Sequence, residues 1–211
     1  MMRQRPKRFY PSGVMEPYTK AGRRIRLFRV CIMKKVLILS GSPRRHGNSD
    51  LLCDEFMRGA ADAGNDVEKI FIRDKKIGYC TACYYCTEHD GVCSIKDDMT
   101  EVLSKIRTAD VIVMASPVYF YAVDAQLKTV IDRTVAQWTE ITGKEFYYIM
   151  TAAEDTETVM DTTLACLRGF AACIDGSEEK GVIYAKGVYE AGEVRDTPYM
   201  KQAYEMGRSV Q

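Results

Sequence analysis

From Lys34 onward the chain alternates short apolar runs with segments of helical spacing, and this alternation constrains the fold more than any other feature. The apolar runs are expected to form five strands, at residues 36–39, 66–72, 111–115, 146–150 and 181–185. Strands that alternate with helices pair in parallel, because each helix carries the chain back across one face of the sheet. The sequence therefore predicts an α/β fold, a three-layer sandwich around a five-stranded parallel sheet.

Charge divides the chain into two parts. The net charge is +1, yet residues 1–32 hold nine Lys or Arg side chains and a single acid, Glu16. We interpret 1–32 as a basic N-terminal extension, either disordered or upstream of a native start at Met33, and 33–211 as the folded domain. Arg26 and Arg29 interrupt the apolar stretch of the extension, and no run reaches the roughly 20 apolar residues of a membrane span. We expect a cytoplasmic protein that binds neither membrane nor nucleic acid.

The segment 40–49, SGSPRRHGNS, leads from the first predicted strand into a helix. Such a loop directs backbone N–H groups and a helix N-terminus at an anion. It lacks the Lys of a triphosphate-binding P-loop, because Asn48 stands at that position. The pattern favours a single terminal phosphate held by Ser42, Arg44, Asn48 and Ser49, although an ordinary capped turn would look similar.

The segment 116–121, SPVYFY, follows the third predicted strand at the same edge of the sheet. A flat heteroaromatic ring needs a stiff backbone with hydrogen-bonding groups and apolar faces to lie on. Together with the phosphate loop, these residues predict a ring slot formed by Pro117, Val118, Tyr119 and Phe120. The alternative is that the three aromatic side chains only cover the core.

Four cysteines lie within fourteen residues, in the spacing C-x2-C-x2-C-x6-C: Cys80, Cys83, Cys86 and Cys93. Short gaps allow several thiolates to point at one centre, and four thiolates match one [4Fe–4S] cluster. Four thiolates also match zinc, although a zinc ribbon pairs two CxxC knuckles that lie farther apart. Free thiols are the third possibility. We treat 79–97 as a Cys-rich insertion whose ligand the spacing leaves open.

Two stretches, GSPRRHGNSDLL and ASPVYFYAVDAQLKTVIDR, resemble the flavodoxin-like NAD(P)H-dependent FMN reductase family. With the cysteine run between them, the chain more closely resembles the iron–sulfur flavoproteins. The resemblance covers about 33–211 and implies the strand order 2-1-3-4-5. It places the FMN phosphate on the four loop residues named above and the isoalloxazine on 117–120. The loop 151–154, TAAE, lacks the glycines that this family often carries beside the flavin.

This resemblance implies an FMN-dependent NAD(P)H oxidoreductase that passes electrons, with a possible [4Fe–4S] cluster, to a small-molecule or protein acceptor. Hydride transfer to a flavin needs no side-chain acid or base, so no catalytic residue is predicted. The family also implies a homodimer or homotetramer in which the cysteine loop of one subunit approaches the FMN of another. The alternative function is a flavodoxin-like electron carrier without nicotinamide activity, with a zinc-bound or metal-free loop.

Overall fold

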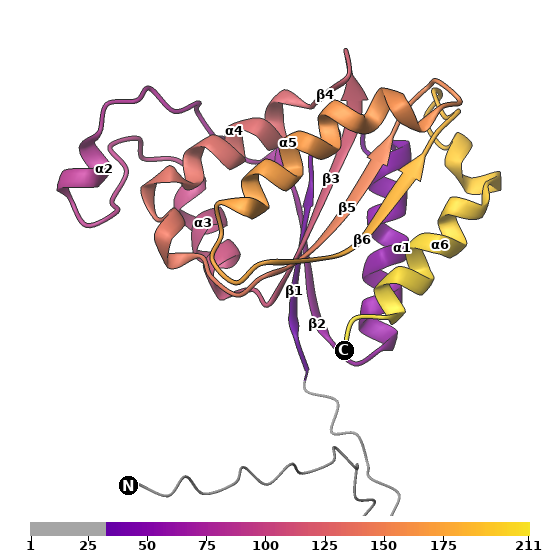
Figure 1. Cartoon of the computed structure of the whole chain (residues 1–211), viewed down its shortest axis with the longest axis horizontal. Helices are drawn as coiled ribbons and strands as arrows, with labels where there is room; N and C mark the ends of the chain where they lie inside the picture. The colour runs from indigo at the N-terminus through magenta and orange to yellow at the C-terminus, as the bar shows by residue number, and fades with distance from the viewer. Residues whose placement is uncertain (1–32) are drawn as a thin grey trace, which may run out of the picture. The chain divides into compact units, whose positions relative to one another are not determined.

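The computed structural model describes residues 33–211, so the prediction for 1–32 lies outside the described residues. Five parallel strands form the sheet in the order β2-β1-β3-β5-β6 (Figure 1). Their bounds are β1 (Lys35–Ser40), β2 (Asp66–Phe71), β3 (Val111–Tyr119), β5 (Glu145–Thr151) and β6 (Glu178–Ala185). Counted along the chain, these five have the order 2-1-3-4-5, which confirms the predicted flavodoxin-like topology. The predicted count of five is short by one, because β4 (Ala122–Val123) pairs antiparallel with the end of β3.

Helices cover both faces of the sheet (Figure 1). One face carries α1 (Asn48–Asp62) and α6 (Pro198–Arg208), and the other carries α3 (Met99–Thr108), α4 (Ala125–Arg133) and α5 (Asp161–Ala172). The short helix α2 (Tyr85–Glu88) lies in the cysteine segment. Single 3-10 turns occur at Ile72–Asp74, Thr134–Ala136, Trp138–Glu140, Glu157–Met160 and Glu193–Asp196. Within residues 33–211 no helix is both long and apolar enough to cross a membrane.

Strand side chains alternate between two cores, which explains why the strands read as continuous apolar runs. Leu37 and Leu39 pack with α3, α4 and α5, whereas Val36 and Ile38 pack with α1 and α6. All four side chains are buried. The sheet is thus enclosed on both faces, and a ligand can reach it only at an edge.

Helices α1 and α6 cross in close contact at two glycines, Gly59 and Gly207. A Cβ on Gly59 would lie 2.0 Å from the carbonyl oxygen of Tyr204, and one on Gly207 would lie 2.1 Å from that of Phe56. The two backbones are therefore in direct contact, at a distance that no side chain allows. This crossing fixes α1, the helix that follows the predicted phosphate loop, against the C-terminal part of the chain.

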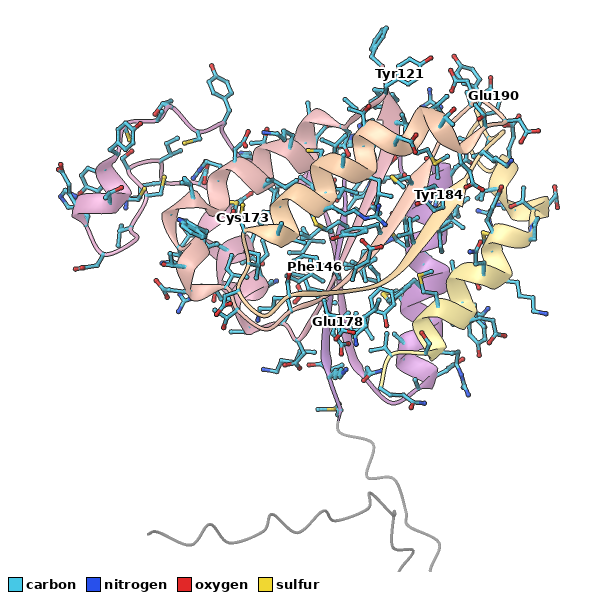
Figure 2. All side chains as sticks on the ribbon, in the orientation of Figure 1. Tyr121, Phe146, Cys173, Glu178, Tyr184 and Glu190 are labelled. Atoms are coloured by element: carbon cyan, nitrogen blue, oxygen red, sulfur yellow. The ribbon has the colours of Figure 1, made fainter. Side chains whose placement is uncertain are left out.

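Strand β3 runs beyond its neighbour β1 at the carboxyl edge. Ser40 at the end of β1 pairs with Ala115, and β3 continues by pairing Pro117 with Thr151 of β5. We predicted a loop at 116–121, but the strand extends to Tyr119 and turns into β4 through a two-residue hairpin. Figure 2 shows Tyr121 of this hairpin at the same edge as Glu190, with Glu178 at the opposite end of the sheet.

Candidate functional site

A cavity of about 280 Å³ opens at the carboxyl edge, bounded by the segments that follow β1, β3, β5 and β6. This is the edge at which parallel α/β sheets bind ligands. All eight residues predicted to contact the cofactor line it: Ser42, Arg44, Asn48, Ser49, Pro117, Val118, Tyr119 and Phe120. The structure therefore brings the phosphate loop and the ring slot together in one cavity.

The phosphate loop is a compact turn that leaves a helix N-terminus open. Ser42 Oγ accepts from the backbone N of Arg44 and donates to its carbonyl oxygen, each at 3.1 Å. Helix α1 then begins at Asn48 behind Gly47, and no side chain caps it. The first amides of a helix have no intrahelical acceptor, so they can bind an anion here. Ser49, which is 1% exposed, lies in this first turn.

Asn48 has a structural role that the sequence did not reveal. Its Nδ2 donates to the carbonyl oxygen of Glu190 at 2.9 Å, and its Oδ1 accepts from the amides of Gly192 at 3.1 Å and Val194 at 3.2 Å. Arg44 Nη1 adds a bond to the carbonyl oxygen of Tyr189 at 3.2 Å. These contacts fasten the β6–α6 connection to the phosphate loop and so close one wall of the cavity.

Seven further residues line the cavity and were not among those predicted: Gly47, Thr151, Ala152, Ala153, Glu154, Val188 and Tyr189. Gly47 lies in the phosphate loop. Thr151 ends β5 and 152–154 follow it, in the loop that lacks the family's glycines, whereas Val188 and Tyr189 follow β6. The rule that ligands lie beyond strand ends was the signal that could have found them.

The side of the cavity predicted to bind the ring is formed by the β3–β4 hairpin, and side-chain hydrogen bonds hold the base of this hairpin. Ser116 Oγ accepts from the backbone N of Asp124 at 2.9 Å, and Asp124 Oδ1 caps α4 by accepting from Leu127 N at 2.9 Å. Burial raises the pKa of Asp124, whose Oδ2 is buried without a partner among the described residues. The rim above this base is formed by the aromatic residues of the hairpin.

These aromatic residues do not cover the core, so that alternative is wrong. Tyr119 is 43% exposed, Tyr121 58% and Phe120 fully exposed. Phe120 and Tyr121 have φ values of 49° and 63°, as in a type I′ turn, which normally carries Asn-Gly. Left-handed backbone at two bulky residues is strained, and such strain concentrates at functional sites. Of these exposed residues, Tyr119 and Phe120 line the cavity.

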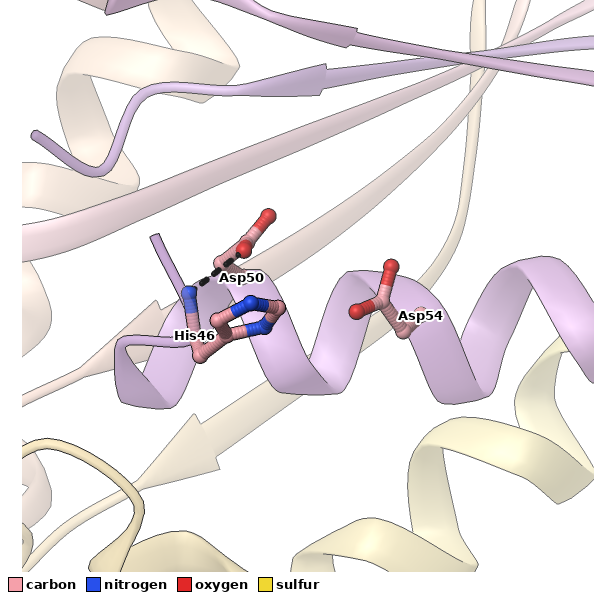
Figure 3. A group of neighbouring side chains, drawn as sticks. All are labelled: His46, Asp50 and Asp54. Atoms are coloured by element: carbon pink, nitrogen blue, oxygen red, sulfur yellow. Dashed lines mark hydrogen bonds between the residues drawn. The ribbon is translucent and has the colours of Figure 1, made fainter. Parts of the chain in front are cut away.

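A second cluster, His46 with Asp50 and Asp54, resembles a metal site by proximity alone (Figure 3). Lys69 Nζ lies 2.8 Å from Asp50 Oδ1 and also pairs with Asp54. The other oxygen of Asp50 accepts from the backbone N of His46 at 2.9 Å. The two carboxylates are therefore already paired, and the cluster is an ion-pair network that joins α1 to β2.

The four cysteines surround one cavity of about 260 Å³, separate from the first. Their loop projects beyond α3 and α4 (Figure 1). No side chain from Arg73 to Asp98 is buried, so this described segment has no apolar core of its own. Segments too small for a core commonly depend on a metal centre for order. The loop therefore fits a group bound in the cavity that its four cysteines line.

Four thiolates that line one cavity suit a [4Fe–4S] cluster, in which each thiolate binds a separate iron, and they also suit tetrahedral zinc. The cluster and the zinc alternative of the sequence analysis therefore both match this set of donors.

Three of the four cysteine sulfurs have a hydrogen-bond partner among the described residues. Ala82 N donates to Cys80 Sγ at 3.4 Å, and Arg133 Nη2 donates to Cys93 Sγ at 3.6 Å. Cys83 Sγ lies 3.3 Å from Ser94 Oγ, and this contact lowers the pKa of the Cys83 thiol. Donors of this kind stabilise thiolates, the form in which cysteine binds metal.

The fold and the cavity define a flavodoxin-like α/β protein with a ligand site at the carboxyl edge of its sheet. Residues 34–169 match the model of the NADPH-dependent FMN reductases. The chain belongs to this family, which is a family of flavin-dependent oxidoreductases.

Several similar proteins are named iron-sulfur flavoproteins. The chain is 45% identical over 100 residues to an iron-sulfur flavoprotein of Methanocaldococcus jannaschii, a match that covers 47% of this chain and 51% of that protein. It is 45% identical over 101 residues to an iron-sulfur flavoprotein of Archaeoglobus fulgidus, covering 48% and 45% of the two chains. The chain thus spans about half the length of the curated relatives it matches.

Solved structures share the fold at low sequence identity. The NAD(P)H:quinone oxidoreductase from Methanothermobacter marburgensis superposes with a TM-score of 0.69 at 16% identity, covering 85% of this chain and 97% of that one. An azoreductase from Bacillus anthracis gives 0.65 at 15% identity, with 83% and 99% covered. These similarities establish the flavodoxin-like architecture.

Proposed function

We propose that this protein is an FMN-dependent NAD(P)H oxidoreductase of the iron–sulfur flavoprotein type. The observation that carries the proposal is the convergence of two separate segments, the open N-terminus of α1 and the extended end of β3, on one cavity. When bound there, FMN supplies a group that accepts two electrons and can release them singly. The protein's part is to hold the phosphate and the ring and to leave one ring face accessible.

Each cavity residue has a role under this proposal. The first amides of α1 and the hydroxyl of Ser49 bind the phosphate, with Arg44 supplying charge. Asn48 keeps the wall closed through its bonds to the β6–α6 connection. The backbone of 117–119 presents hydrogen-bonding groups to the ring, and the hairpin aromatics shield the open side. No side chain is required as an acid or base.

The cysteine loop is proposed to hold a [4Fe–4S] cluster on Cys80, Cys83, Cys86 and Cys93. Support comes from the cavity that the four cysteines share, the hydrogen bonds to their sulfurs and the names of the relatives. The loop projects away from the helices that cover its own sheet (Figure 1). We therefore propose a homodimer or homotetramer in which the loop of one subunit lies near the FMN of another. Electrons then pass to a small-molecule or protein acceptor.

Cofactor analysis of anaerobically purified protein tests this proposal. Extracted flavin is expected to be FMN, because the cavity has one phosphate loop and no second nucleotide fingerprint. Iron and acid-labile sulfide are expected in equal amounts, at about four per chain for one [4Fe–4S] cluster. FAD, or no flavin, would contradict the cavity assignment. Zinc without sulfide would contradict the cluster while leaving the flavin site standing.

A further inference from the structure

Arg133, the last residue of α4, closes the base of the cysteine loop. Its guanidinium forms a two-pronged ion pair with Asp97, with Nη1–Oδ2 at 2.7 Å and Nη2–Oδ1 at 3.0 Å. Nη1 also donates to the carbonyl oxygen of Gly78 at 2.6 Å. Gly78 precedes the insertion and Asp97 ends it, so one side chain joins the two ends of the segment that carries all four cysteines.

The ion pair between Arg133 and Asp97 is buried and held by further hydrogen bonds, so it is rigid. Arg133 is 2% exposed, and Asp97 also accepts from the amides of Gly78 at 2.9 Å and Met99 at 3.1 Å. A planar guanidinium that forks onto a carboxylate fixes both partners in orientation as well as in distance. The cysteine segment has no buried side chains between Arg73 and Asp98, so this pair supplies order that packing does not.

The same guanidinium reaches the cysteine cavity. Arg133 lines that cavity, and its Nη2 lies 3.6 Å from Cys93 Sγ. Its Nε is buried without a hydrogen-bond partner among the described residues. The two other hydrogen-bond partners of loop sulfurs, Ala82 N and Ser94 Oγ, belong to the loop itself. Arg133 comes instead from the folded core and brings a positive charge.

We propose that Arg133 is a positioning residue for the iron–sulfur cluster, holding Cys93 in place for ligation and raising the reduction potential of the cluster through its N–H···S bond. This inference rests on the proposed function. Hydrogen bonds to the sulfurs and positive charge nearby both stabilise the reduced, more negative form of a cluster. Arg133 therefore makes the cluster a better acceptor of electrons.

Arg133→Met and Arg133→Lys test this role, with Arg107→Met as the matched control. Arg107 lies on α3 and lines a neighbouring cavity with Cys93. Its guanidinium pairs with Glu140 at 2.8 Å and donates to Gln137 at 3.1 Å, and among the described residues it donates no hydrogen bond to a cysteine sulfur. Iron and sulfide per FMN, the rate of iron loss to a chelator and the midpoint potential are measured on each protein. FMN content reports that the sheet and its cavity are intact.

Arg133→Met is expected to lose iron to the chelator at least tenfold faster than wild type. Where the cluster remains, its reduction equilibrium should fall about tenfold, which is about 59 mV toward negative potential for one electron. Arg133→Lys keeps the charge but loses the fork, so it should lose iron faster with a smaller shift in potential. Arg107→Met should match wild type in all three measurements.

The outcomes separate this inference from the function on which it rests. Wild-type protein without iron overturns both the cluster and the role of Arg133. Wild-type protein with a cluster, and Arg133→Met with the same potential and the same rate of iron loss, overturns the role of Arg133 alone. If Arg133→Met is recovered without FMN, Arg133→Lys decides the matter, and a wild-type rate of iron loss in that variant refutes the inference.

Discussion

The crossing of α1 and α6 gives a stability prediction that can be worked out directly from distances. In Gly59→Ala the new Cβ would stand 2.0 Å from the carbonyl oxygen of Tyr204, and in Gly207→Ala the Cβ would stand 2.1 Å from that of Phe56. Ordinary contacts are wider by roughly 1.4 Å, and both clashing atoms belong to backbone that no rotamer change can move. The two helices must separate, which uncovers the core between them.

We expect each substitution to destabilise the fold by about 3 kcal/mol, the upper range for overpacking. With a urea m-value of about 2 kcal/mol/M, the unfolding midpoint should fall by about 1.5 M. Circular dichroism during urea unfolding measures this change. FMN affinity should fall as well, because α1 carries the turn that is proposed to bind the phosphate.

Gly169→Ala is the matched control for these substitutions. It lies in α5, and nothing stands within 4 Å of its added Cβ. Alanine in a helix is favoured over glycine, so this variant should gain about 0.5 to 1 kcal/mol. Equal midpoints for Gly59→Ala and Gly169→Ala would refute the direct backbone contact.

Three further predictions concern the cavity. Asp124→Asn keeps the cap on α4 but removes a buried carboxylate. Burial raises the pKa of Asp124, so the protonated carboxyl adds to the stability of the wild type at low pH, and this contribution is lost as the pH rises through the raised pKa. The variant should gain stability relative to wild type as the pH rises above about 4, the ordinary pKa of aspartate, and a pH-independent difference in urea unfolding would contradict this. Replacing Phe120 and Tyr121 by Asn-Gly should raise the free energy of unfolding by about 1 to 2 kcal/mol, because Asn and Gly suit the positive φ of this turn. The same replacement should raise KM for the acceptor about threefold to tenfold, because the aromatic contact is lost. A variant that is no more stable would argue against strain at this turn. Ser49→Ala should raise the Kd for FMN about tenfold to a hundredfold and leave Tm unchanged. Asn48→Ala should raise the Kd and also lower Tm, because three hydrogen bonds are lost. Unchanged FMN binding in both variants would show that this loop does not bind the phosphate.

The sheet could be predicted from the sequence because its strands are buried on both faces. The runs at 36–39 and 111–115 are apolar at every position, which leaves a central parallel strand as the simplest structure. The loops after β1 and β3 could be predicted to share one site on the same grounds, since topology alone brings the carboxyl ends of the strands together. All eight of the predicted contact residues line the cavity as a result.

Features that depend on tertiary contacts could not be predicted. The sequence Tyr119–Ala122 carries no glycine or asparagine, so its type I′-like hairpin contradicts local turn preferences. The bonds of Asn48 to the β6–α6 connection join residues more than 140 positions apart. Arg133 likewise reaches its loop from 36 positions away, where spacing gives no signal.

Anaerobic reduction by NADH and NADPH tests the central claim most directly. Bound FMN should lose its oxidised absorbance within seconds after one nicotinamide is added, and the cluster signal should follow by electron paramagnetic resonance. The control is the Ser49→Ala variant depleted of FMN, in which the cluster should stay oxidised. Protein that contains FMN yet stays oxidised with both nicotinamides, and is reduced only by a protein donor, would contradict the proposed activity and identify an electron carrier.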